Sequence, residues 1–244
     1  MKSIDFLKNN GVDIDNSLQL FGDIETYNET IGEFLFGLDD KLNKIETYKN
    51  NGDMANYAIF VHSLKSDAKY FGFNKLRDLA YDHELKSKAN DYYFIKEHFA
   101  DLKKEVESTK KIVQEYMSDN TEETVSKPQE VNNAKVYDKN TILVVDDSNI
   151  VRNFVKRLFS DQYEIDCAND GEEALNILKA NIDNNKIICM LLDLNMPKVN
   201  GFTVLDFMKE MNLFQKSPVA IISGDSSKET IDKAFTYGIV DMIE

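Results

Sequence analysis

The sequence predicts two domains of different class: an all-α four-helix bundle, followed by an α/β domain built on a doubly wound parallel sheet of five strands. Residues 1–117 place apolar side chains at intervals of three and four, the spacing of helices that bury one face. From residue 141 onward, short apolar runs alternate with helical segments, as parallel strands joined by helices require. Residues 118–140 are polar and contain Pro128, which predicts a flexible linker between the domains 1–117 and 141–244.

The helical half begins with short helical pieces within residues 3–21, which we expect to cap the bundle. A long amphipathic helix from about Ile24 to Lys49 follows, and the turn at residues 51–53 starts the next helix. Two further helices are expected, one after Asn74 and one from about Asp91 to Met117. Long antiparallel helices joined by short turns form a four-helix bundle.

Composition narrows the function classes. The chain has 244 residues, 42% of them hydrophobic and 30% charged, and its net charge of −14 with no basic patch argues against nucleic-acid binding. The first ten residues lack the apolar run of a signal peptide, and no stretch is long and apolar enough to span a membrane, which predicts a cytoplasmic protein. Cys167 and Cys189 lie within apolar runs, so we interpret both as reduced core residues.

The helix at residues 53–72 carries the first candidate site. Its core face is expected to hold six residues: Tyr57, Phe60, Val61, Leu64, Ala68 and Phe71. His62 falls on the opposite side, so its ring is expected to face water, with Lys65 and Lys69 nearby to attract an anion. A neutral histidine can form a covalent intermediate with a phosphoryl group, whereas the alternative is an incidental surface histidine. His83 and His98 lack this setting and are expected to be solvated or half-packed.

The run from His62 to Ala68, HSLKSDA, with a glycine ten positions after the histidine, resembles the HxLKG motif of histidine-phosphotransfer (HPt) domains. Ser66 stands where that family usually has glycine, and serine is small enough for a partner to approach. The resemblance covers roughly the first half of the chain. It implies that His62 accepts a phosphoryl group, and the positive charge of Lys65 is expected to assist.

Acidic residues follow the predicted strands of the second half. The apolar runs lie at five places: 142–145, 163–167, 187–192, 219–222 and 239–243. Asp146 and Asp147 end the first run, Asp193 ends the third and Ser223 ends the fourth, and ligand sites of such sheets lie at these carboxyl ends. Gathered carboxylates repel one another, and Mg²⁺ with oxygen ligands, including the backbone carbonyl of Asn195, would relieve that repulsion. The alternative is that the acidic residues cap strand ends, with Asp147 as a helix N-cap.

The motifs LVVDDS, LLDLNMPKVNG and AIISGD resemble the receiver domain of response regulators in order and spacing over nearly this whole half. The resemblance implies a flavodoxin-like fold, Asp193 as the phosphoacceptor, Asp146 and Asp147 as the metal-binding pair, and Ser223 as the hydroxyl that rearranges on phosphorylation. Two features depart from the family. Met242 replaces the aromatic switch residue, and the family's lysine and last helix would come after Glu244, so we expect a fragment of a longer protein.

Together, the two candidate sites predict a phosphorelay protein in which His62 and Asp193 each give or take a phosphoryl group. We expect it to be a carrier and not an enzyme, since the sequence has no Gly-rich nucleotide loop. Its partners would be a sensor histidine kinase or other receiver or HPt proteins. Two alternatives stay open: a regulatory front end of a longer enzyme, such as a cyclic-dinucleotide cyclase or phosphodiesterase, and a docking scaffold that is not phosphorylated.

Overall fold

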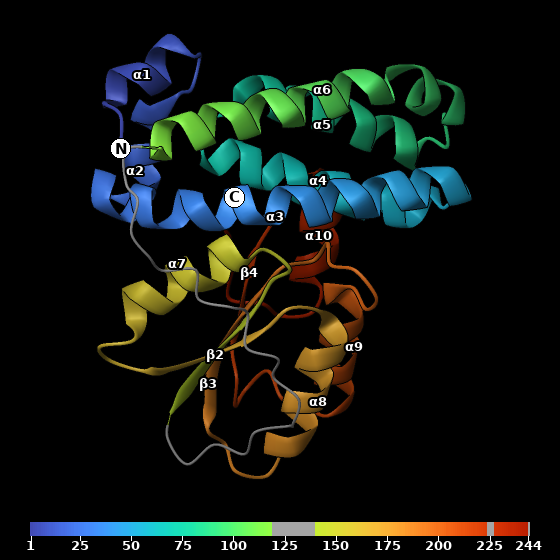
Figure 1. Ribbon diagram of the computed structural model, residues 1–244. Helices are drawn as coiled ribbons and strands as arrows, with labels where there is room; N and C mark the ends of the chain where they lie inside the picture. Colours follow the sequence, from blue (N-terminus) through green and yellow to red (C-terminus); the bar gives the residue numbers. More distant parts are fainter. Residues whose placement is uncertain (119–139, 224–226, 244) are drawn as a thin grey trace. The chain divides into compact units, whose positions relative to one another are not determined.

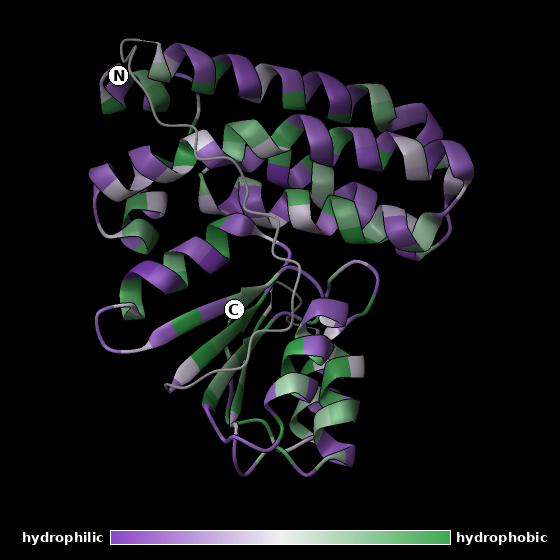
Figure 2. Ribbon diagram, turned by 60° about the horizontal axis from the view of Figure 1, so that its bottom comes forward, coloured by the Kyte–Doolittle hydropathy of each residue, from purple (hydrophilic) through white to green (hydrophobic). Residues whose placement is uncertain are grey.

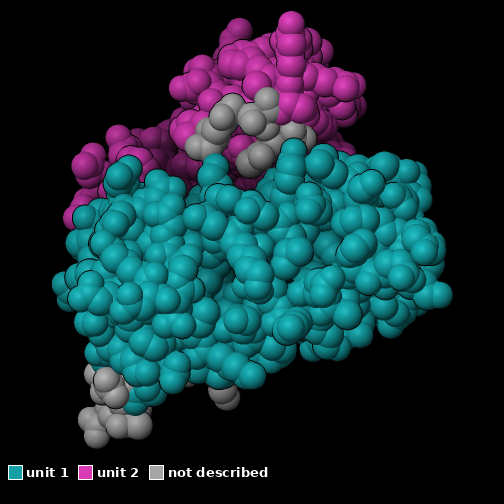
Figure 3. Space-filling model, turned by 90° about the horizontal axis from the view of Figure 1, so that it is seen from above, with its two compact units in different colours: residues 1–127 teal, residues 128–244 magenta. Residues whose placement is uncertain are grey.

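The computed structural model describes residues 1–118, 140–223 and 227–243. The chain forms two compact units, residues 1–127 and 128–244, which are coloured separately in Figure 3. The expected linker at residues 118–140 lies outside the described residues except at its two ends.

The described part of unit 1 is helical, as predicted, and four long helices follow two short ones (Figure 1). The helices are α1 (Ile4–Asn9), α2 (Ile14–Phe21), α3 (Ile24–Asn51), α4 (Met54–Tyr70), α5 (Asn74–Lys88) and α6 (Tyr92–Met117). Aspartate is the N-cap residue of α3, α4 and α6. Asp23, Asp53 and Asp91 each accept a hydrogen bond from the backbone N–H three residues later. Gly52 adopts the left-handed conformation that ends α3.

Helix α4 is enclosed by its neighbours on most of its circumference. Its predicted core face is confirmed, since Tyr57, Val61 and Leu64 are completely buried. The bend that follows α4 packs closely on the start of α2: a Cβ atom on Gly72 would lie 2.6 Å from the backbone oxygen of Asp13. Gly72 also has a φ of +76°, so any other residue would be strained there. The turn therefore fixes where α4 ends and α5 begins.

Unit 2 is a five-stranded parallel sheet in the order β2-β1-β3-β4-β5, which confirms the predicted doubly wound fold. The strands are β1 (Thr141–Val145), β2 (Glu164–Ala168), β3 (Ile187–Leu192), β4 (Val219–Ile222) and β5 (Asp241–Ile243). The helices are α7 (Asn149–Phe159), α8 (Gly171–Asn181), α9 (Gly201–Glu210) and α10 (Lys228–Phe235). Strand β5 begins two residues later than predicted, and Val240, which precedes it, is 64% exposed.

Strand β1 lies between β2 and β3, and all five of its residues are buried. Helices α8 and α9 cover one face of the sheet and contribute to its main core, whereas α7 lies on the other face (Figure 1). Strands β1, β3 and β4 are hydrophobic along most of their length, as burial of both sheet faces requires, whereas the helices alternate in character (Figure 2). Cys167 and Cys189 are free thiols in the half-buried parts of β2 and β3. Among the described residues, no helix is long and apolar enough to cross a bilayer.

Candidate functional site

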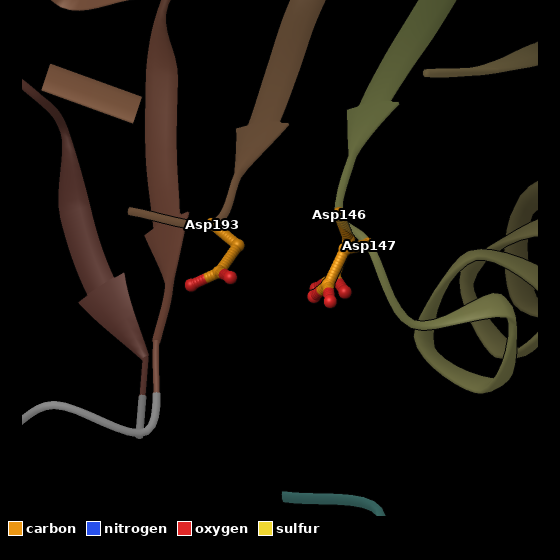
Figure 4. A group of neighbouring side chains, drawn as sticks. All are labelled: Asp146, Asp147 and Asp193. Carbon is orange, nitrogen blue, oxygen red and sulfur yellow. The ribbon is translucent and has the colours of Figure 1, made fainter. Parts of the chain in front are cut away.

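The carboxyl ends of β1 and β3 bring three aspartates together. These strands are neighbours, with Val145 paired to Leu192, and the backbone N–H of Asp193 donates a 2.8 Å hydrogen bond to the carbonyl oxygen of Val145. Asp146 and Asp147 follow β1, and Asp193 follows β3, so all three side chains point into the same space beyond the strand ends (Figure 4). One oxygen atom from each carboxylate lies within 4.8 Å of the others.

Burial makes this cluster of charge costly. Asp146 is 6% exposed and Asp193 is 7% exposed, while Asp147 is half-buried. Burial and the charges of Asp193 and Asp147 raise the pKa of Asp146 well above its usual value, although the N–H of Ser148 donates a 2.8 Å hydrogen bond to its Oδ1. Three oxygen donors around one space, with the negative charge concentrated there, fit a hard divalent cation.

The loop after β3 and the end of β4 hold the other predicted site residues. Asn195 lies on the loop two positions after Asp193 and is half-buried. Ser223 follows β4, the other neighbour of β3, and is 3% exposed. The start of α9 approaches so closely that a Cβ atom on Gly201 would lie 2.3 Å from the backbone oxygen of Asp193. Glycine is therefore required at position 201 to keep the aspartate loop in place.

Arg152 is a neighbour of this site that the sequence reading did not identify. Its guanidinium donates hydrogen bonds to the backbone oxygen of Asp146 and to the side-chain oxygen of Asn149. The positive charge opposes the rise in the pKa of Asp146. Its position six residues after Asp146, one turn into the following helix, was the available signal.

The structure places His62 differently from the prediction. The ring was expected to face water, but His62 is only 4% exposed, so that prediction is wrong. Its Nδ1 lies 2.8 Å from Oε1 of Glu84, a residue of α5. Helix α5 packs against the side of α4 that carries His62, and the buried carboxylate gives the imidazole a polar partner there.

Two lysine side chains pair with Glu84 beside His62. Lys65 and Lys88 each donate to the Glu84 carboxylate, at 2.8 Å and 2.7 Å, and Nζ of Lys65 lies 3.2 Å from Nδ1 of His62. Burial by itself would raise the pKa of Glu84, but its hydrogen bonds with His62, Lys65 and Lys88 outweigh burial and hold the pKa well below its usual value. Lys65 therefore lies beside His62, as predicted, and its ammonium group is paired with the carboxylate of Glu84. No short motif identifies Glu84, since only the pairing of α4 with α5 brings it to His62.

The other two histidines differ from each other. His83 is 1% exposed, which contradicts the expected solvated or half-packed environment, and its Nδ1 lies 2.7 Å from the hydroxyl of Tyr57. Burial lowers the pKa of His83 to about 4. The side chain of His98 is 51% exposed, in agreement with the prediction. Neither histidine lies in the acidic cluster of unit 2.

Comparisons with known proteins identify unit 2. The family model described as "Response regulator receiver domain" matches residues 142–244. The two-component response regulator ORR3 of Oryza sativa is 30% identical over 103 residues, which cover 42% of this chain and 76% of ORR3. The receiver domain of the Francisella response regulator 1452 is a solved structure with 27% identity and a TM-score of 0.38, covering 43% of this chain and 82% of that one.

Longer proteins also match this part of the chain. The CAI-1 autoinducer sensor kinase/phosphatase CqsS of Vibrio cholerae is 33% identical over 104 residues, 42% of this chain and 15% of CqsS. A probable cyclic di-GMP phosphodiesterase of Vibrio cholerae is 33% identical over 103 residues, 42% of this chain and 22% of that protein. The chain thus spans a small part of these relatives. The family model and the strand order both indicate a receiver domain in residues 142–244. The chain belongs to the response regulator receiver family.

Proposed function

We propose that this chain carries phosphoryl groups in a two-component signalling pathway, on Asp193 of the receiver domain and on His62 of the helical unit. The observation that carries the proposal is the meeting of Asp146, Asp147 and Asp193 at the adjacent ends of β1 and β3. Its partners would be sensor histidine kinases, other receivers or HPt proteins. The matching sensor kinase CqsS supports this class of partner.

In the receiver, Asp193 would act as the nucleophile. Its carboxylate oxygen attacks the phosphorus of a phosphohistidine, an O–P bond forms as the N–P bond breaks, and the departing imidazole nitrogen takes up a proton. Asp146, Asp147, Asp193 and the carbonyl of Asn195 would hold Mg²⁺, which supplies positive charge that offsets the charge of the carboxylates and the phosphoryl group. Ser223, buried at the end of β4, would donate a hydrogen bond to a phosphoryl oxygen.

In the helical unit, the bond between Nδ1 of His62 and Glu84 selects the reactive nitrogen. A carboxylate accepts a hydrogen bond, so Nδ1 carries the proton and the lone pair of the neutral ring resides on Nε2. Nε2 would attack an aspartyl phosphate, the N–P bond forming as the O–P bond breaks and the carboxylate leaves. Because His62 is 4% exposed, this step requires the side chains that cover the ring to move.

The test is phosphotransfer from a phosphorylated histidine kinase and from a phosphorylated receiver to the wild-type chain, His62→Gln, Asp193→Asn and the double variant. We expect the kinase to label Asp193, giving an alkali-labile acyl phosphate that Asp193→Asn lacks. The phosphorylated receiver should label His62, giving an acid-labile phosphoramidate that His62→Gln lacks. Equal labelling of the double variant and the wild type would overturn the proposal. The cytoplasmic location stays a prediction from the sequence.

One comparison favours a second candidate. The match to a probable cyclic di-GMP phosphodiesterase fits a receiver that regulates a catalytic domain of the same protein. Under that candidate, Asp193 would still be phosphorylated, but His62→Gln would leave the signalling output unchanged. The output of a strain carrying His62→Gln therefore separates the two candidates.

A further inference from the structure

The loop from Asp193 to Gly201 connects β3 to α9 and contains a strained residue. Lys198 has a φ of +62°, in the left-handed region that residues with a Cβ atom avoid. Such strain persists only where the surroundings hold the backbone in place.

An ion pair with a buried carboxylate anchors the Lys198 side chain. Its Nζ lies 2.5 Å from Oδ2 of Asp170, which is 3% exposed. The other oxygen of Asp170 accepts a 2.9 Å hydrogen bond from the N–H of Glu173 and so caps α8. Both oxygens of Asp170 are therefore engaged, one with the start of α8 and one with the loop. A pair with one buried partner is screened less than an exposed pair.

Backbone contacts beside this pair join the same two segments. The N–H of Gly171 donates a 3.1 Å hydrogen bond to the carbonyl oxygen of Val199, and a Cβ atom on Gly171 would lie 2.3 Å from that oxygen. Within the loop, the N–H of Gly201 donates to the carbonyl oxygen of Leu194 at 3.0 Å. The loop is thus fastened to α8 on one side and closed on itself at Leu194, next to Asp193.

We propose that Lys198 is a positioning residue of the acidic site: by pairing with Asp170, it holds the 193–201 loop in the one conformation that presents the Asp193 carboxylate and the Asn195 carbonyl to a divalent cation. This inference rests on the proposed cation site at Asp193. Lys198 touches neither the cation nor the phosphoryl group in this role. It acts through the backbone of the loop, as residues that orient metal ligands do.

The test measures Mg²⁺ affinity of the whole chain by titration, for the wild type, Lys198→Met, Lys198→Arg, Lys198→Gly and Lys216→Met. Lys216→Met is the matched control, since Lys216 is an exposed lysine of the same unit that precedes β4 at the opposite end of the strands. We expect Lys198→Met to weaken Mg²⁺ binding about tenfold, Lys198→Arg to bind within about twofold of the wild type, and Lys198→Gly to weaken it too, although glycine removes the strain.

A second measurement needs no metal. In the Mg²⁺-free protein, amide hydrogen exchange at Gly171, which is bonded to Val199, should be faster in Lys198→Met than in Lys216→Met, while exchange in β1 stays unchanged. Equal Mg²⁺ affinity of Lys198→Met and Lys216→Met would overturn the inference. Failure of the wild type to bind Mg²⁺, or binding that Asp193→Asn and Asp146→Asn leave intact, would instead overturn the proposed cation site and this inference with it.

Discussion

Replacement of Asp146 with asparagine should stabilise the metal-free receiver domain at pH 7. The carboxylate of Asp146 lies within 4.8 Å of those of Asp147 and Asp193, and the residue is 6% exposed. At that distance and an effective dielectric constant of about 20, two unit charges repel by about 3.5 kcal/mol. Solvent around half-exposed Asp147 screens part of this repulsion, so we expect the free energy of unfolding to rise by about 1–3 kcal/mol.

The pH dependence of this gain follows from the raised pKa of Asp146. The Asp146 carboxyl binds its proton more tightly in the folded protein than in the unfolded chain. The destabilisation by its negative charge is therefore absent below the unfolded pKa of about 4 and grows as the pH rises through the folded pKa. Urea denaturation in a chelator, followed by a signal from unit 2, should therefore show no gain near pH 4 and a growing gain as the pH is raised. The matched control is Asp161→Asn, which removes an exposed charge of the same unit.

Added Mg²⁺ should reverse the order of stability. The wild type gains free energy by binding the ion, whereas Asp146→Asn loses a carboxylate ligand and gains less. Two results would refute the reasoning: a metal-free Asp146→Asn that is less stable than the wild type at pH 7, or equal stabilisation of both proteins by Mg²⁺.

Three further predictions concern single contacts. Gly201→Ala should lower the free energy of unfolding by about 1–3 kcal/mol in urea titrations, since its Cβ would lie 2.3 Å from the Asp193 oxygen, and unchanged stability would contradict this. Glu84→Gln should lower the free energy of unfolding by about 3 kcal/mol at pH 7, because its lysine partners lose their buried counter-charge. Since the pKa of Glu84 is lowered, the difference in stability between wild type and variant should shrink as the pH falls below about 4. A difference that stays constant with pH would contradict this prediction. His83, with its pKa lowered to about 4, should make the wild type lose about 3 kcal/mol between pH 6.5 and pH 4, a loss that His83→Gln should lack.

The receiver half could be predicted from the sequence in most details, because its signals are local. An acidic residue directly after an apolar run lies at the carboxyl end of a strand, and parallel neighbours bring such ends together. Asp146, Asp147 and Asp193 accordingly meet as expected. The parallel five-stranded sheet agrees as well. The start of β5 was placed two residues early because Ile239 and Val240 extend the apolar run.

The environment of His62 could not be predicted in the same way. Helical periodicity identifies the face of α4 that joins the core, and that face is confirmed. Periodicity within one helix says nothing about a second helix packed on the other side. Glu84 approaches His62 from α5, 22 residues further along the chain, and no spacing rule connects the two. The burial of His83 escaped prediction for the same reason, since its partner Tyr57 lies on another helix.

Among the polar contacts that join α4 to α5, two lie between side chains that are both buried: Tyr57 to His83, and His62 to Glu84. If α5 slid by one helical turn, about 5.4 Å, both contacts would break at once, and Glu84 would keep only its partner Lys88 on the same helix. Apolar side chains alone tolerate such sliding far better, so these contacts fix the position of α5 along the axis of α4. Among homologous helical units, the four positions should consequently vary as linked pairs, each histidine changing only together with its partner.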